Sequence, residues 1–315
     1  MPRRLAAPLL LLALLASPLT AQYAAQEGRP FTPEDALNVA SLSVQDVTPD
    51  GRWIAATVAT RRDRMGTDHF RFGDPTYVSP STAEFVLIDA DSGAQTPILT
   101  GRVQMRGAEW SPDGETLAFF LREGDDFHLH LFDLDDRRVQ RVDLDTDLPI
   151  ASNSRLDWRP DGSGLLLDLR AADWAERARA AFLEMTEGPI VVQDGSDPFL
   201  DWDRVRNMGA LIRPALARLD GEVEVLLPEG NWRDITQSED GQWFAIEGRK
   251  PLKTVYEGGG GSENRLLRMN VASRDTAYVV EPDTEGISTN WAPDGTRYVY
   301  SDEGHIHLRS IFEDS

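Results

Sequence analysis

One short phrase occurs five times along the chain, and each copy joins two apolar stretches through a Pro-Asp-Gly turn or a close variant. Proline presets φ near −65° at the second turn position, aspartate can bond its own backbone, and glycine accepts a positive φ where the next strand begins. Each copy therefore predicts a tight link between two antiparallel strands. The copies are VTPDGRWIAATVA from Val47, WSPDGETLAFFL from Trp110, WRPDGSGLLLDL from Trp158, QSEDGQWFAIEG from Gln237 and WAPDGTRYVYSD from Trp291.

The residues around each turn read as further strands. After the second turn, an apolar strand from Leu117 to Leu121 leads into the polar stretch REGDD, the alternating segment FHLHLFDL, the turn DDRR and the segment VQRVDL. Together with the segment that ends at Trp110, these make four strands joined by short turns. One repeat therefore predicts a four-stranded antiparallel meander.

The spacing of the repeats indicates how the meanders assemble. Blade repeats of propellers are ~40 to 50 residues long, and the five turns match this length if the longer intervals carry insertions. A meander cannot bury both of its faces alone, so neighbouring blades must stack, with the repeated tryptophans packed between them. We predict an all-β fold, a β-propeller of four-stranded antiparallel blades within residues 41–315. The five predicted blades lie near residues 41–100, 101–145, 153–228, 231–281 and 286–315.

The fifth predicted blade is the least complete. The sequence ends at HIHLRSIFEDS, in the third predicted strand of that blade. Its fourth strand and any further blades are then missing, so we expect an incomplete propeller. Closure of a five-bladed ring by an N-terminal strand is the alternative.

Two insertions interrupt the repeats. Residues 61–82 are polar and Arg-rich, with aromatic side chains at Phe70, Phe72 and Tyr77. Loops that a rigid scaffold holds often carry function, although a solvated loop explains the composition equally well. The second insertion predicts one helix in the third blade, with an apolar face that ends before Gly188, followed by an aromatic and acidic loop to Asn207. The apolar positions are Trp174, Ala178, Ala181, Phe182 and Met185, and Asp173 with Glu176 forms a capping-box pattern.

The N-terminus has the pattern of a secretory signal peptide. Arg3 and Arg4 precede an apolar run, and small residues around Ala21 predict cleavage there, which gives a signal peptide of residues 1–21. Residues 22–40 then form an N-terminal segment with a short helix. No later segment approaches the ~20 apolar residues of a membrane span. We expect a periplasmic or secreted protein without membrane insertion.

The composition excludes several classes of function. The chain has no Cys, so it has no disulfide, thiolate metal site or Cys nucleophile. Its 53 Asp and Glu against 32 Lys and Arg give a net charge of −21. That sign repels phosphate backbones and anionic membranes, so we expect no nucleic-acid partner.

Two His-x-His pairs are the metal candidates in the sequence: His128 with His130 in the second blade, and His305 with His307 in the fifth. A period of two residues places each pair on one face of a strand, which can suit metal ligation. No acidic third ligand stands at a matching spacing, and half-buried strand histidines are commoner than ligands. We therefore predict no metal and no cofactor.

Two segments resemble a known family. Residues 31–59, FTPEDALNVASLSVQDVTPDGRWIAATVA, resemble the start of the propeller in exported bacterial serine peptidases of the prolyl oligopeptidase family, and GPIVVQDGSDPFLDWD is similar to a segment of the same group. The Pro-Asp-Gly phrase is shared with TolB-like propellers. The resemblance implies a short capped helix before the first blade, seven or eight blades, and a C-terminal α/β-hydrolase domain with a Ser-Asp-His triad in which the serine lies in a Gly-x-Ser-x-Gly elbow.

No catalytic residue can be carried over to this chain. DGSGL at Asp161 is a blade turn, and GGGGSEN at Gly258 has Asn264 where the closing glycine should stand. In dipeptidyl-peptidase relatives an insertion of the propeller supplies glutamates that hold the free amine of the substrate. The resemblance makes Glu176 and Glu184 the candidates here, although the consecutive glutamate pair of those relatives is absent. The structural alternative is that Glu176 caps the helix and Glu184 is solvated.

Three hypotheses follow from the sequence. The chain is the non-catalytic propeller portion of an exported serine peptidase, which gates or binds peptide substrates for a hydrolase domain absent from this chain. Alternatively it is a stand-alone periplasmic TolB-like propeller that acts as a protein-interaction module. A propeller enzyme with a central metal is the third hypothesis, and it requires carboxylates and histidines that converge on the axis.

Overall fold

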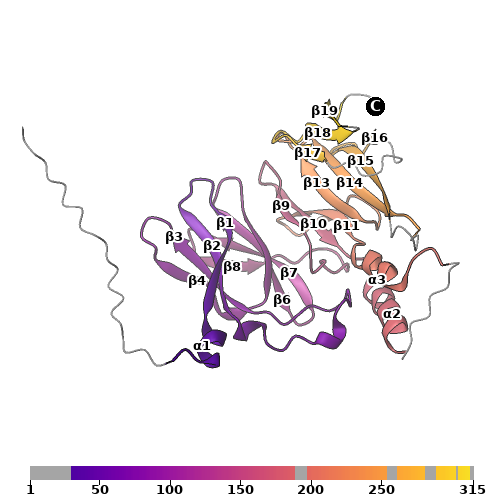
Figure 1. Ribbon diagram of the computed structural model, residues 1–315. Helices are drawn as coiled ribbons and strands as arrows, with labels where there is room; N and C mark the ends of the chain where they lie inside the picture. The colour runs from indigo at the N-terminus through magenta and orange to yellow at the C-terminus, as the bar shows by residue number, and fades with distance from the viewer. Residues whose placement is uncertain (1–29, 189–196, 254–260, 281–288, 303, 313–315) are drawn as a thin grey trace, which may run out of the picture.

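The computed structural model describes residues 30–188, 197–253, 261–280, 289–302 and 304–312, and five antiparallel sheets follow one another along this part of the chain (Figure 1). In every sheet the hydrogen-bonded neighbours are also neighbours in sequence, so each sheet is a meander. The predicted all-β architecture of propeller blades is confirmed. The predicted signal peptide lies outside the described residues.

The five sheets are numbered here as blades 1 to 5. Blade 1 comprises β1 (Ala40–Val47), β2 (Trp53–Thr60), β3 (Ala83–Asp89) and β4 (Gln95–Val103); blade 2 comprises β5 (Met105–Trp110), β6 (Thr116–Glu123), β7 (Asp126–Asp133) and β8 (Arg138–Arg141). Blade 3 comprises β9 (Leu156–Trp158), β10 (Gly164–Leu169), β11 (Arg213–Arg218) and β12 (Val223–Val225). Blade 4 comprises β13 (Trp232–Gln237), β14 (Trp243–Pro251), β15 (Ser262–Asn270) and β16 (Thr276–Val280), and the described strands of blade 5 are β17 (Thr289–Trp291), β18 (Arg297–Asp302) and β19 (His305–Ser310).

The Pro-Asp-Gly phrases form the turns that the sequence predicts. Their glycines have φ between 65° and 76°, a region that is open to glycine and strained for other residues. In each turn the aspartate accepts a hydrogen bond from the backbone N–H two residues on, as Asp113 does from Glu115 at 3.0 Å. The fourth copy makes the same turn with Glu239 in place of proline, because Asp240 and Gly241 keep these two features.

The core lies between the blades, and the second strand of each blade contributes to two core layers. Phe119 of β6 packs toward blade 1, whereas Phe120 packs toward blade 3. Side chains alternate across a strand, so a strand covered on both faces must be apolar throughout. Trp110 and Trp158 are only 4% and 6% exposed in these layers, as the inter-blade packing prediction requires.

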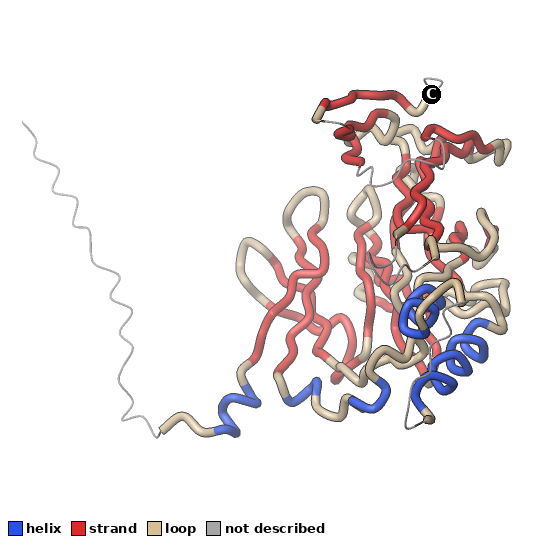
Figure 2. The backbone as a smooth tube through the Cα atoms, turned by 45° about the vertical axis from the view of Figure 1, so that its right-hand side comes forward, coloured by secondary structure: helices blue, strands red, loops and turns tan. Residues whose placement is uncertain are grey.

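The ends of the strands line two opposite sides of the row of sheets. We call these sides edges, and they differ in the connections that they carry. The first strands lie beside one another, since β1 contacts β5 and β5 contacts β9. The later turns are joined in the same way, since Arg159 donates to the Gly241 carbonyl at 2.7 Å and the Glu239 N–H donates to the Asp294 carbonyl at 3.3 Å. The five phrase turns therefore share one edge, called the turn edge here. The β2–β3 and β10–β11 connections leave from the opposite edge, and Figure 2 shows that the helices lie along this side. We call it the insertion edge.

The helices partly match the expectations. α1 (Pro33–Asn38) has the expected cap, since Thr32 and Asp35 form a capping box. α2 (Trp174–Thr186) buries Trp174, Ala178, Phe182 and Met185, as its periodicity predicts. The capping box predicted for Asp173 and Glu176 is wrong, because Asp173 makes no capping bond and instead pairs with Arg177 at 3.0 Å. The loop predicted up to Asn207 is also wrong in part, because it contains a second helix, α3 (Asp201–Gly209).

Candidate functional site

The two insertions meet on the insertion edge at Asp74. The carboxylate lies in the blade 1 loop, after the short 3₁₀ helices η1 (Arg62–Arg64) and η2 (His69–Arg71), and its side chain is fully buried. Asp74 accepts hydrogen bonds from the Thr76 N–H at 2.9 Å and from Arg71 Nε at 2.9 Å, and it pairs with Arg179 of α2. Burial acts to raise the pKa of Asp74, but its hydrogen bonds with Thr76 and Arg71 outweigh burial and hold that pKa below the usual value. An ionised, buried carboxylate thus joins segments 105 residues apart.

Close packing joins the same two insertions. Gly73 lies against the indole of Trp202 on α3, and a Cβ at Gly73 would stand 2.7 Å from Trp202 Cζ3. Gly73 also has a φ of 81°, so glycine is required at this position both for its backbone conformation and for its contact. A Cβ at Gly209, at the end of α3, would stand 3.2 Å from Pro75 of the blade 1 loop. The loop and the helices therefore form one packed unit.

Blade 3 holds the helix pair by an apolar layer and a buried cation. Phe182 and Met185 of α2 pack with Val205 of α3. Arg170 follows β10 and is buried; it stacks at 4.1 Å on Trp174 and donates to the carbonyl of Gly209 at 3.0 Å. Burial lowers the pKa of Arg170 to about 10, so the guanidinium stays charged at neutral pH. The insertion is thus fixed to its blade.

The two candidate glutamates lie on exposed positions of α2. Glu176 is exposed, and Glu184 pairs with Arg204 of α3 at 2.9 Å. Among the described residues, no recorded contact brings Glu176 and Glu184 together. Glu184 therefore contributes to the α2–α3 contact, and a role for either residue toward a substrate amine stays a prediction.

Two of the four candidate histidines, His130 and His307, make packing contacts with aromatic rings. His130 is buried and stacks on Phe119, with its Nε2 3.3 Å from a carboxylate oxygen of Glu123 and its Nδ1 3.1 Å from the carbonyl of His128. His307 stacks on Tyr300 at 4.8 Å, and His305 is exposed at the start of β19. In the part of the chain that the structure describes, no group of three or more His, Asp or Glu is arranged to hold a metal ion.

A row of carboxylates on the first strands lies near the turn edge. Asp46 accepts from the Trp110 N–H at 2.7 Å, and Glu109 accepts from the Trp158 N–H at 3.0 Å, so each acid links one blade to the next. Burial, reinforced by the charge of Asp157, raises the pKa of Glu109 to about 8. Burial likewise raises the pKa of Asp157 to about 6.

Sequence reasoning missed this row, although a signal was present. Asp46, Glu109 and Asp157 each stand five residues before the glycine of their turn. An acidic residue at one fixed place in three repeats indicates a shared contact. We assign the row to the joints between blades, because its recorded bonds run to the backbone of the neighbouring blade.

The five meanders define the chain as an all-β, propeller-type protein. No protein-family model matches the chain. It is similar to the uncharacterized peptidase YuxL of Bacillus subtilis, with 26% identity over 181 residues, which is 52% of this chain and 25% of that protein. The chain thus spans about a quarter of the length of this curated relative.

Solved structures with a similar arrangement include TolB and peptidases. TolB from Acinetobacter baumannii has 16% identity and a TM-score of 0.44 over 86% of this chain and 52% of TolB. Acylaminoacyl peptidase from Pyrococcus horikoshii has 14% identity and a TM-score of 0.48 over 86% of this chain and 38% of the peptidase. No helix among the described residues is long and apolar enough to cross a membrane.

Proposed function

We propose that this chain is the non-catalytic propeller portion of an exported serine peptidase of the prolyl oligopeptidase family. In this proposal the insertion edge binds peptide and presents it to a hydrolase domain outside the chain. The joining of two separate insertions through Asp74 and Arg179 is the observation that carries it. Blade 2 forms its four-stranded sheet without an insertion. An ion pair on a buried carboxylate between two insertions fixes their relative position, as a binding surface requires.

Exposed aromatic side chains on these insertions support a binding role. Phe70 and Phe72 of the blade 1 loop are 95% and 82% exposed, and Trp202 of α3 is exposed by about half. Burial of a large exposed aromatic side chain against a partner stabilises the complex, and such side chains are frequent anchors in interfaces. The similarity to a bacterial peptidase supports a peptide as that partner, and the predicted N-terminal signal peptide supports export.

The test uses the mature chain, residues 22–315, with fluorescent peptides and anisotropy as the readout. Peptide binding should weaken about tenfold in the Phe70→Ser, Phe72→Ser double variant, because ~1.4 kcal/mol of aromatic contact is lost. The matched control is Ile306→Ser, which removes an 83% exposed apolar side chain from β19 in blade 5. Equal binding by both variants, or the absence of peptide binding, would overturn the proposal.

Catalysis is expected to need the hydrolase domain. The mature chain alone should neither cleave peptide or ester substrates nor react with a fluorophosphonate, because the sequence has no Gly-x-Ser-x-Gly elbow outside blade turns. In the complete enzyme, Glu176→Ala or Glu184→Ala should lower kcat/KM for substrates with a free N-terminus and spare N-blocked ones. Equal effects on both substrate types would remove these glutamates from the amine site.

A stand-alone interaction propeller of the TolB-like kind is the second candidate. Exposed apolar side chains on the two outermost described sheets favour it: Leu42 and Val44 on β1, and Ile306 and Leu308 on β19. Such faces promote association through apolar contact. Light scattering on the mature chain should then show self-association, and a sharp monomer that binds no protein would contradict this candidate.

A further inference from the structure

A cleft of about 290 Å³ opens on the insertion edge between α3 and blade 4. α3 contributes Arg206 and Asn207, the start of blade 4 contributes Asn231 and Arg233, and β14 contributes Arg249. Three guanidinium groups from three elements therefore line one small cleft. The sequence pattern alone does not reveal this group, because the three arginines belong to different segments.

The backbone directs two of these arginines to the cleft. Arg233 is the extra residue of a β-bulge in β13, where the register with β14 shifts between Trp232 and Asp234. Bulges change the direction of a side chain and are frequent beside functional sites. Arg249 is half-buried, and its N–H donates to the carbonyl of Asn231 at 2.9 Å, which fixes the two walls together. Neither Arg233 nor Arg249 forms an ion pair with any residue that the structure describes.

The cleft is positive in a chain that is strongly negative. Among its described lining residues one is a carboxylate, Asp203, which lies 3.3 Å from Arg206, so these residues carry a charge of about +2 in a protein of net charge −21. The carbonyl end of α3 would normally repel an anion. Here the Met208 carbonyl accepts from Trp174 Nε1 at 2.8 Å, and Arg170 binds the Gly209 carbonyl, so this helix end is already compensated.

We propose that this cleft is a subsite for the carboxylate of a peptide, from its C-terminus or from an Asp or Glu side chain. The inference rests on the proposed peptide-binding function and names the part of the substrate that is recognised. Arginine binds a carboxylate through two parallel N–H bonds, and an arginine without an ion-pair partner keeps that capacity free. The side-chain amides of Asn207 and Asn231 can bond the adjoining peptide group. The volume suits one or two residues of a ligand.

The experiment measures binding of three related peptides to the mature chain by calorimetry. The first has a free C-terminus, the second is amidated, and the third is amidated with an internal Glu. The free acid, the Glu peptide or both should bind about tenfold more tightly than the neutral amide. Whichever acidic peptide binds more tightly identifies the source of the carboxylate. Inorganic phosphate should compete with the acidic peptides and leave the neutral amide unaffected.

Two arginine variants assign the effect to the cleft. Arg233→Gln and Arg249→Gln should each remove most of the tenfold preference and leave binding of the amide unchanged. Arg138→Gln, on an exposed position of β8, makes the same change of charge elsewhere and should leave the preference intact. Thermal melting checks that every variant is folded. Equal binding of acid and amide, or equal effects of all three variants, overturns the subsite while peptide binding stands. If no peptide binds, both proposals fail.

Discussion

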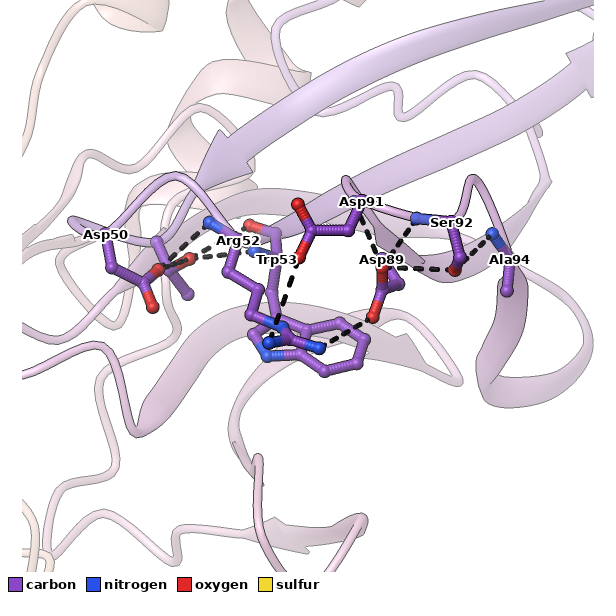
Figure 3. Close-up of polar contacts among 8 residues, drawn as sticks. Asp50, Arg52, Trp53, Asp89, Asp91, Ser92 and Ala94 are labelled. Atoms are coloured by element: carbon purple, nitrogen blue, oxygen red, sulfur yellow. Dashed lines mark hydrogen bonds and ion pairs between the residues drawn. The ribbon is translucent and has the colours of Figure 1, made fainter.

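The turns of the turn edge and the loop of the insertion edge use charge in different ways. Within the turns the charged contacts are local: Arg52 pairs with Asp89 at 3.2 Å and lies 5.5 Å above the Trp53 ring, while Asp50 bonds within its own turn (Figure 3). At the insertion edge Asp74 is buried and is bound by residues of two insertions. The contacts within the turns recur in every blade and stabilise the blades themselves. The contacts of Asp74 occur once and fix the two insertions relative to each other.

The pKa values express the same difference. The hydroxyl of Ser111 holds the pKa of the turn residue Asp113 below its usual value, and the Thr296 N–H lowers the pKa of Asp294 to about 2. These turn aspartates are stabilised by their own turns. The low pKa of Asp74 instead requires Thr76 and Arg71 to overcome full burial. A change at Asp74 should therefore affect far more of the molecule than a change in any one turn.

Loss of the Asp74 carboxylate should have the largest effect on stability. Asp74→Ala leaves Arg71 and Arg179 without their shared partner. Breaking a fully buried ion pair costs about 3 to 5 kcal/mol, and because these two arginines are about one third exposed, we expect a loss of about 2 to 4 kcal/mol. We expect this loss in the free energy of unfolding by urea, with a change in tryptophan fluorescence as the insertion loosens beside Trp202. Asp91→Ala, an exposed carboxylate at the turn edge, is the control. Similar losses in both variants would refute the difference between the edges.

Glu109→Gln should remove the loss of stability at high pH that the ionised Glu109 causes between blades 2 and 3. The folded pKa of Glu109, about 8, lies above the ordinary value of 4.5, so its contribution is fully present below pH 4.5 and is lost as pH rises through 8. Gln keeps an acceptor for the Trp158 N–H and carries no charge. We expect the variant to gain ~1 to 2 kcal/mol over the wild type at pH 9 and little at pH 4.5. A constant difference across this range would contradict the buried position of Glu109.

Asp294→Asn should produce a smaller change, confined to acid. The folded pKa of about 2 lies below the ordinary 3.8, so the stabilisation is present above pH 3.8 and is lost as pH falls through 2. The wild type should lose more of its urea midpoint between pH 5 and pH 2 than the variant does. Parallel pH profiles would show that the turn does not depend on the ionised carboxylate.

Arg52→Ala should have the smallest effect. Arg52 pairs with Asp89 and Asp91 from a side chain that is half exposed, and ion pairs of exposed side chains contribute ~0.5 kcal/mol or less. Thermal melting should place the variant within about 2 °C of the wild type. A loss comparable to that of Asp74→Ala would mean that the turn edge is as tightly coupled as the insertion edge.

The sequence predicted the features that repeat or have a local period. The five turns follow from the residues of each turn, and the apolar face of α2 follows from helical spacing. α3 was missed because DWDRVRNMG buries only Val205, which is too little to set a period. The capping box at Asp173 failed because Arg177, one helical turn away, takes the carboxylate.

The site was much less visible in the sequence than the fold. Both insertions were recognised as interruptions of the repeat, but their contact depends on Asp74 and Arg179, and nothing local relates these two positions. The same applies to Arg206, Arg233 and Arg249, which come together only when α3 packs beside blade 4. Glu109 was missed because its pKa depends on burial between two blades.

A double-mutant cycle on Asp74 and Arg179 tests most directly whether the two insertions form one unit. The free energy of unfolding is measured for the wild type, Asp74→Ala, Arg179→Ala and the double variant. We predict a coupling energy of about 1.5 kcal/mol or more, because each single change removes the same buried contact. A coupling energy near zero would show that the blade 1 loop and the helices of blade 3 are held independently, and it would contradict a shared binding surface on the insertion edge.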